Sequence, residues 1–144
     1  GLRYVKIKVP RSSDTILTPH IGEFSAMTGI DVSEIRADRF TVSRNYAREN
    51  QCVVVLKDYI TVIALPDGRA FAHCAPNAGL AKGGSGDVLA GMIASFLAQG
   101  NDAETAAKLG VYYHSLAGRR AAERAGVYAM RPEDVIAAFR EVLI

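Results

Sequence analysis

Residues 77–89 read NAGLAKGGSGDVL and place four glycines within eight positions, directly before an apolar pattern of helical period. Glycine lets the backbone turn sharply and approach a ligand closely, and N–H groups at a helix N-terminus bind anions. The stretch therefore predicts a phosphate-binding loop that leads into a helix. It matches neither of two common loops, because the sequence lacks Gly-Lys-Ser/Thr and has Leu89 where the dinucleotide fingerprint has its third glycine.

An acid, Asp87, lies in the first turn of this predicted helix. The helix dipole stabilises a carboxylate there, but a bound phosphate would repel it, so a phosphate site needs a chemical reason for this residue. One reason is proton abstraction from a hydroxyl that attacks a phosphoryl group, while the amides of Gly84, Ser85 and Gly86 bind the developing charge. The alternative is a capped helix after a glycine-rich turn. Spacing alone leaves both open.

The composition indicates one folded domain over residues 1–144, because 49% of the residues are hydrophobic and 22% are charged. The formal net charge is +2, and no basic run is long enough to neutralise several phosphates, so nucleic acid is disfavoured as a partner. Cys52 and Cys74 lack the spacing of a metal site or a disulfide framework. No apolar stretch approaches the ~18 residues of a membrane span, and the N-terminus lacks a leader's apolar segment. We expect a cytoplasmic protein without membrane contact.

The pattern of apolar residues alternates between strand and helix periods. The predicted strands are residues 4–9, 15–17, 52–56, 60–65 and 69–73, with a hairpin turn at Pro66, Asp67 and Gly68. The first predicted helix starts near Gly22 or Glu23 and ends at Gly29, and residues 32–50 form one or two helices after an Asp31–Glu34 capping box. Three further helices are predicted: one from Asp87 to Gly100, one from Asp102 to Ala125, and one that begins at Pro132. This order favours an α/β layered sheet with helices packed on it.

Four blocks resemble the ribokinase-like superfamily and, within it, the ADP/ATP-dependent NAD(P)H-hydrate dehydratases. They are residues 18–24 (TPHIGEF), 53–68 (VVVLK, TVIA and PDG), 84–91 (GSGDVLAG) and 114–118 (HSLAG). The resemblance implies a ribokinase-like layered sheet, present as roughly the C-terminal half of the full domain. Residues 1–14 do not match, and we expect the chain to be a homo-oligomer or to associate with a missing N-terminal half.

The resemblance also implies a reaction and a set of site residues. Phosphorylation of the hydrate's hydroxyl by ADP or ATP with Mg²⁺, followed by loss of phosphate, would restore NADH or NADPH. Asp87 would be the catalytic base and also contact substrate, with His20 and Glu23 on the substrate side. The nucleotide-binding residues would be Asn77, Gly79, Gly83, Gly84, Ser85, Gly86 and Lys57. No protein residues are expected to form a dedicated metal site.

Two residues depart from the usual pattern of the family, and two other functions stay open. Ile21 and Asp58 stand where the family usually has proline and glycine, so the turns after His20 and Lys57 are expected to differ. The same loop would serve a kinase of small alcohols of the vitamin-precursor type, and a truncated chain could be a catalytically inactive interaction domain. His20 taken alone would be a hydrogen-bonded surface histidine, and His114 is expected to be a packed helix residue.

Overall fold

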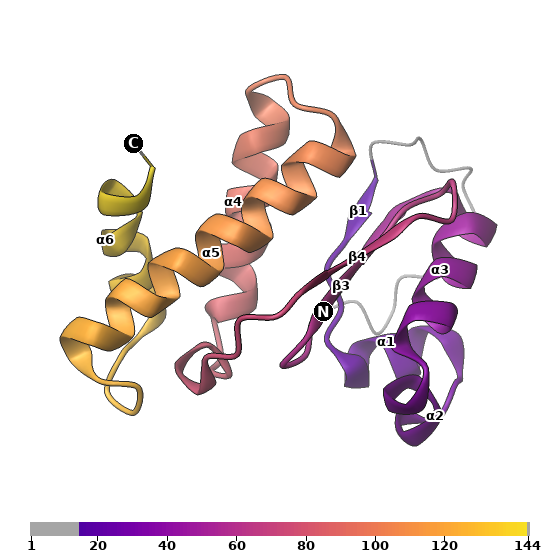
Figure 1. The fold of residues 1–144 in the computed structure, drawn as a ribbon, viewed down its shortest axis with the longest axis horizontal. Coiled ribbons are helices and arrows are strands. Elements are labelled where there is room, and N and C mark those ends of the chain that lie inside the picture. The colour runs from indigo at the N-terminus through magenta and orange to yellow at the C-terminus, as the bar shows by residue number, and fades with distance from the viewer. Residues whose placement is uncertain (1–14, 144) are drawn as a thin grey trace. The chain divides into compact units, whose positions relative to one another are not determined.

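The computed structural model describes residues 15–143, which form two compact units divided between Cys74 and Ala75 (Figure 1). The strand expected at residues 4–9 lies outside the described residues. Each unit has its own secondary structure, a sheet with helices in the first and a set of helices in the second. The α/β fold class predicted from the sequence is thereby confirmed.

The first unit contains a four-stranded sheet in the order β1-β2-β3-β4. Its strands are β1 (Ile16–Leu17), β2 (Val53–Leu56), β3 (Thr61–Ala64) and β4 (Ala70–His73). β1 is parallel to β2, with Ile16 opposite Val53, whereas β2, β3 and β4 form an antiparallel meander. The predicted turn joins β3 to β4, and Gly68 adopts the left-handed φ of +90° that the turn requires.

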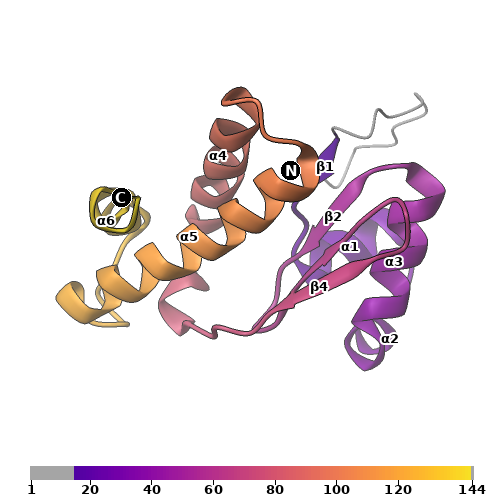
Figure 2. The same ribbon diagram turned by 45° about the horizontal axis from the view of Figure 1, so that its top comes forward.

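Three helices of this unit lie on one side of the sheet (Figure 2). They are α1 (Ile21–Thr28), α2 (Val32–Ala37) and α3 (Arg39–Asn50). Alternate strand residues, such as Val54, Leu56 and Val62, pack with Phe24 and Ile35 into one fully buried cluster. The intervening residues of β2 are buried as well, which explains why this strand reads as a continuous apolar run rather than an alternating one.

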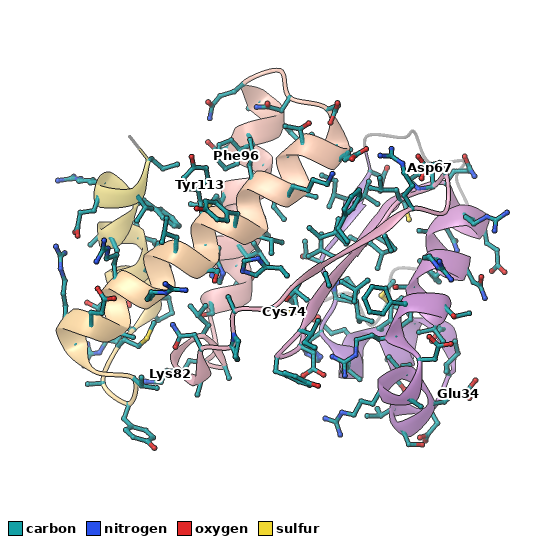
Figure 3. The ribbon with its side chains drawn as sticks, viewed as in Figure 1. Glu34, Asp67, Cys74, Lys82, Phe96 and Tyr113 are labelled. Carbon is teal, nitrogen blue, oxygen red and sulfur yellow. The ribbon has the colours of Figure 1, made fainter. Side chains whose placement is uncertain are left out.

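The second unit consists of a 3₁₀ turn, η2 (Ala78–Leu80), and the helices α4 (Ser85–Ala98), α5 (Ala103–Ala125) and α6 (Pro132–Val142). Small residues let α5 approach both other helices (Figure 1). One buried cluster joins Ala117, Ala121, Met130, Val135 and Ala138. Between α4 and α5 the rings of Phe96 and Tyr113 stack, with centroids 5.8 Å apart (Figure 3).

The helix starts differ from the sequence prediction in three places, one of which is α4, where the helix begins at Ser85 rather than Asp87. α1 starts at Ile21 because His20, which is not one of the usual capping residues, accepts a hydrogen bond from the backbone of Glu23. The box expected between Asp31 and Glu34 is replaced by bonds from the N–H and hydroxyl of Ser33 to the Asp31 carboxylate. Glu34 is exposed on α2 (Figure 3).

The contact between α4 and α5 predicts opposite effects for two glycine substitutions. In Gly110→Ala the new Cβ would overlap Ile93 Cγ1 and lie 3.3 Å from Ile93 Cα, so unfolding should become easier by about 1–3 kcal/mol. Gly91→Ala, with nothing within 4 Å of its new Cβ, should stabilise α4 by about 0.5–1 kcal/mol. Urea denaturation measures both, and equal effects would contradict this packing.

The N-cap of α5 predicts acid sensitivity. Hydrogen bonds from Thr105, whose backbone N–H lies 2.7 Å from Asp102 Oδ1, hold the pKa of this carboxyl below its usual value. The cap therefore stabilises the fold above the unfolded pKa of about 4 and is lost as pH falls through the lower folded pKa. Asp102→Asn should keep the cap at neutral pH and lessen the loss of melting temperature on acidification. An unchanged acid profile would contradict the assignment.

Candidate functional site

The glycine loop begins with a turn that Asn77 closes. Its Oδ1 accepts the N–H of Gly79 at 3.0 Å, and its carbonyl accepts the N–H of Leu80 at the same distance. Gly79 is buried because the sulfur of Met130 occupies the space that a Cβ would need. Asn77 and Gly79 thus have structural reasons to be present. The Nδ2 amide of Asn77 bonds no group within residues 15–143 and can still donate to a ligand.

The start of α4 leaves two backbone donors without a protein partner. Its N-cap is Gly84, at φ +91°, and no side chain caps the helix. Ser85 N–H donates to Lys82 O at 3.2 Å, but the N–H groups of Gly84 and Gly86 donate to no carbonyl in the described part of the chain. Such uncapped amides at the positive end of a helix dipole form an anion-binding site.

Asp87 lies in the first turn of α4 with an exposed side chain. Its backbone N–H donates to Gly84 O at 3.1 Å. Across residues 15–143, its carboxylate accepts no hydrogen bond and joins no ion pair. The group is therefore accessible, next to the uncapped amides and able to accept a proton.

A second group of predicted residues meets at one edge of the sheet, where the parallel strands β1 and β2 end. His20 and Lys57 pair as an isolated parallel bridge, and Lys57 N–H donates to Pro19 O at 2.8 Å. This pairing follows from the β1–β2 register, because the carboxyl ends of parallel strands lie at the same edge. His20, Glu23 and Lys57 are thus brought together in the first unit.

His20 and Glu23 also cap α1, a role that the sequence analysis did not predict. Glu23 N–H donates to His20 Nδ1 at 3.1 Å, and His20 N–H donates to Glu23 Oε2 at 3.0 Å. Nδ1 is therefore the unprotonated nitrogen in this arrangement. The His20 side chain is 61% exposed, so the rest of its ring can still contact a ligand. The spacing of His20 and Glu23, three positions apart, is the sequence pattern that could have predicted this capping pair.

Asp58 gives the turn after Lys57 a partner on α3. Arg39 Nη1 lies 3.3 Å from Asp58 Oδ2 and 3.4 Å from Ile60 O, while its Cζ is 5.0 Å from the centre of the Tyr59 ring. The guanidinium is largely buried, with 12% of the side chain exposed. An ion pair and a cation–π contact therefore hold a loop in which the family's glycine is absent.

The other motif residues fit a structural role. His114 is buried on α5, as expected for a packed helix position.

Within residues 15–143, no three His, Cys, Asp or Glu side chains gather closely enough to hold a metal ion. The same residues include no helix with both the length and the apolarity needed to cross a membrane.

The comparisons with known proteins point in one direction. The family described as NAD(P)H-hydrate dehydratase matches residues 1–140. A bifunctional NAD(P)H-hydrate repair enzyme of Thermofilum pendens is 47% identical over 116 residues, which are 81% of this chain and 22% of that protein. An ADP-dependent (S)-NAD(P)H-hydrate dehydratase of Xanthomonas campestris is 36% identical over 130 residues, 90% of this chain and 45% of the relative.

A solved structure has the same fold. The ADP/ATP-dependent NAD(P)H-hydrate dehydratase of Bacillus subtilis, co-crystallised with ATP and Mg²⁺, superposes with a TM-score of 0.84 at 36% identity. The match covers 89% of this chain and 46% of that one. The ribokinase-like fold expected from the sequence is confirmed. The present chain spans less than half the length of these relatives.

The backbone of the loop predicts a sharp difference between neighbouring glycines. Gly84→Ala should destabilise the protein by about 1–3 kcal/mol, because an alanine at φ +91° is strained and its Cβ would lie 3.0 Å from Pro132 Cγ. Gly83→Ala is the matched control, since nothing lies within 4 Å of its new Cβ and its φ is not left-handed. Thermal and urea denaturation of both variants test this, and equal losses would contradict the loop conformation.

Proposed function

This chain belongs to the NAD(P)H-hydrate dehydratase family, and we propose that it supplies the phosphate loop and the catalytic base of such an enzyme. The reaction is the nucleotide-dependent dehydration of hydrated NADH or NADPH, a repair of the cofactor. One observation supports it above all others. The uncapped amides of Gly84 and Gly86 and the unpartnered carboxylate of Asp87 are adjacent at one helix N-terminus.

In the first step, Asp87 accepts the proton of the hydrate's hydroxyl group while the oxygen of that hydroxyl group attacks the terminal phosphorus of ADP or ATP. The new O–P bond forms while the bond from phosphorus to the bridging oxygen breaks, and the shortened nucleotide leaves. The negative charge on the phosphoryl oxygens is stabilised by the N–H groups of Gly84 and Gly86 and by the α4 dipole. These groups are held in place before the reaction, so no reorganisation is needed.

In the second step, the C–O bond breaks and phosphate departs with its electron pair. The lone pair of the ring nitrogen drives this departure, and loss of a ring proton then restores NADH or NADPH. Hydroxide is a poor leaving group and phosphate is a good one. Phosphorylation by the nucleotide is therefore what makes the dehydration possible.

Mg²⁺ would be held chiefly by the nucleotide. Magnesium is commonly bound through one or two carboxylates, water and substrate phosphates rather than by a cage of protein ligands. The described residues fit this mode, because they contain no cluster of three ligands and place Asp87 next to the phosphate loop. The ion would neutralise charge on the phosphate oxygens, and Asp87 is the residue positioned to contact it or its water.

We propose a separate ligand-binding role for the edge cluster of the first unit, which consists of His20, Glu23 and Lys57. Ligands of open α/β sheets bind outside the carboxyl ends of the strands, and His20, Glu23 and Lys57 lie where β1 and β2 end. We assign Lys57 to nucleotide phosphate and His20 with Glu23 to the hydrated nicotinamide. Asn77, Gly79, Gly83 and Ser85 complete the proposed nucleotide contacts.

Two further proposals concern the setting of the chain. We propose that it acts as a homo-oligomer or together with an N-terminal half, because the matches cover only 45% and 46% of the length of the relatives. We also propose a cytoplasmic location. The cysteines support it, because the spacing of Cys52 and Cys74 matches no disulfide framework, which suits a reducing compartment.

A coupled assay tests the function. Hydrated NADH, ADP or ATP, and Mg²⁺ should give reduced cofactor, followed by its absorbance, and inorganic phosphate. Asp87→Asn should lower kcat by at least about a hundredfold, since general-base catalysis contributes that much. Asp102→Asn, which removes a carboxylate from the start of another helix and retains an N-cap, is the control.

The products distinguish the alternatives. A phosphorylated small alcohol in place of reduced cofactor would identify a kinase. Full activity of Asp87→Asn would refute the assignment of the base. Turnover that appears only after addition of an N-terminal half would show that this chain is one part of a two-part enzyme.

A further inference from the structure

Lys82 precedes the glycines of the loop, in the sequence Lys-Gly-Gly-Ser-Gly-Asp, where a lysine would ordinarily be assigned to phosphate. Its ammonium is engaged elsewhere. Lys82 Nζ donates to the backbone carbonyl of Met130 at 2.9 Å and to that of Tyr128 (Figure 3). The two acceptors lie 46 and 48 residues further along the chain, in the segment that joins α5 to α6.

The same segment contacts the loop at two more points. The Met130 side chain is 1% exposed and fills the space above Gly79. Pro132, the first residue of α6, lies against Gly84, the N-cap of α4. Residues 128–132 therefore support both ends of the glycine loop, and the Lys82 ammonium is the only charged group bonded to this segment's carbonyls within residues 15–143.

We propose that Lys82 is a positioning residue that clamps residues 128–132 against the glycine loop and thereby fixes the phosphate-binding amides. The proposal rests on the proposed function, because it takes Gly84 and Gly86 as the phosphate donors. Lys82 is assigned no direct contact with phosphate. Its backbone carbonyl also accepts the Ser85 N–H at 3.2 Å, so the residue connects the segment to the first turn of α4.

The energetic reason lies in the state of the two carbonyls. Bonds to an ammonium are stronger than neutral ones, and removal of the donor leaves the acceptors to find water. The segment would then loosen, and Pro132 would no longer restrain Gly84. Because anion binding by backbone amides depends on their being held in place beforehand, a looser loop binds the nucleotide more weakly.

Three variants of the chain separate this role from others. Lys82→Met retains most of the side-chain length and removes the donor, Lys82→Arg retains a charged donor, and Arg119→Met removes an exposed positive charge on α5 as a control. Hydrogen exchange of the ligand-free protein is measured first. ADP affinity is then measured by calorimetry at a temperature at which every variant is folded.

Lys82→Met should increase exchange of the hydrogen-bonded amides of Ser85, Ala129, Met130 and Arg131 about tenfold and weaken ADP binding by a similar factor. Lys82→Arg should recover part of both, and Arg119→Met should match the unaltered protein. Weaker binding with unchanged exchange would overturn the proposal in favour of direct phosphate contact. Faster exchange with unchanged ADP affinity would overturn it in favour of a purely structural bond.

The exchange measurement also separates this proposal from the proposed function. Absence of ADP binding and of turnover, both in the unaltered chain alone and after addition of an N-terminal half, would refute the proposed function. Unchanged exchange in the ligand-free Lys82→Met protein would refute the clamp whatever the enzyme's activity. The two failures therefore cannot be confused.

Discussion

The N-terminus of α4 is the constraint on which the second unit depends. A helix must begin with backbone N–H groups that its own carbonyls cannot satisfy, and here no side chain takes them. Gly84 turns the chain into the helix with a left-handed φ, and the N–H of Gly86 meets no backbone carbonyl within residues 15–143. The cost of unsatisfied donors is tolerable only where water or an anion can reach them. An exposed carboxylate, Asp87, completes the arrangement.

The first unit brings side chains that the sequence predicted to bind ligands to one edge of its sheet. The short parallel pairing of β1 and β2 sets His20 beside Lys57, although the two residues are 37 positions apart in the sequence. The two reciprocal hydrogen bonds that cap α1 then fix the orientations of the His20 and Glu23 side chains. A residue at such an edge can therefore serve the fold and the ligand together, and the capping role does not argue against binding.

In each unit, a positively charged side chain stabilises a loop by bonding to residues far away in the sequence. Arg39 on α3 holds the turn that contains Asp58, and Lys82 holds the segment before α6. In each case a charged side chain donates to backbone carbonyls, which ties a loop to a partner far along the chain. Neither residue stands out in the sequence, because a partner more than a dozen positions away leaves no local pattern. At position 58, the only signal in the sequence was that aspartate stands where the family usually has glycine.

The sequence by itself determined where the strands and helices of residues 15–143 lie, that a glycine-rich turn leads into a helix with an acid in its first turn, and which family the chain resembles. Those features depend on local periodicity, on glycine's freedom and on residues adjacent in the chain. Tertiary structure decided that His20 caps α1, that the Ser85 amide is already bonded, and that Lys82 faces carbonyls. Each of these depends on which groups satisfy a donor or a charge in three dimensions, and spacing along a chain does not encode that choice.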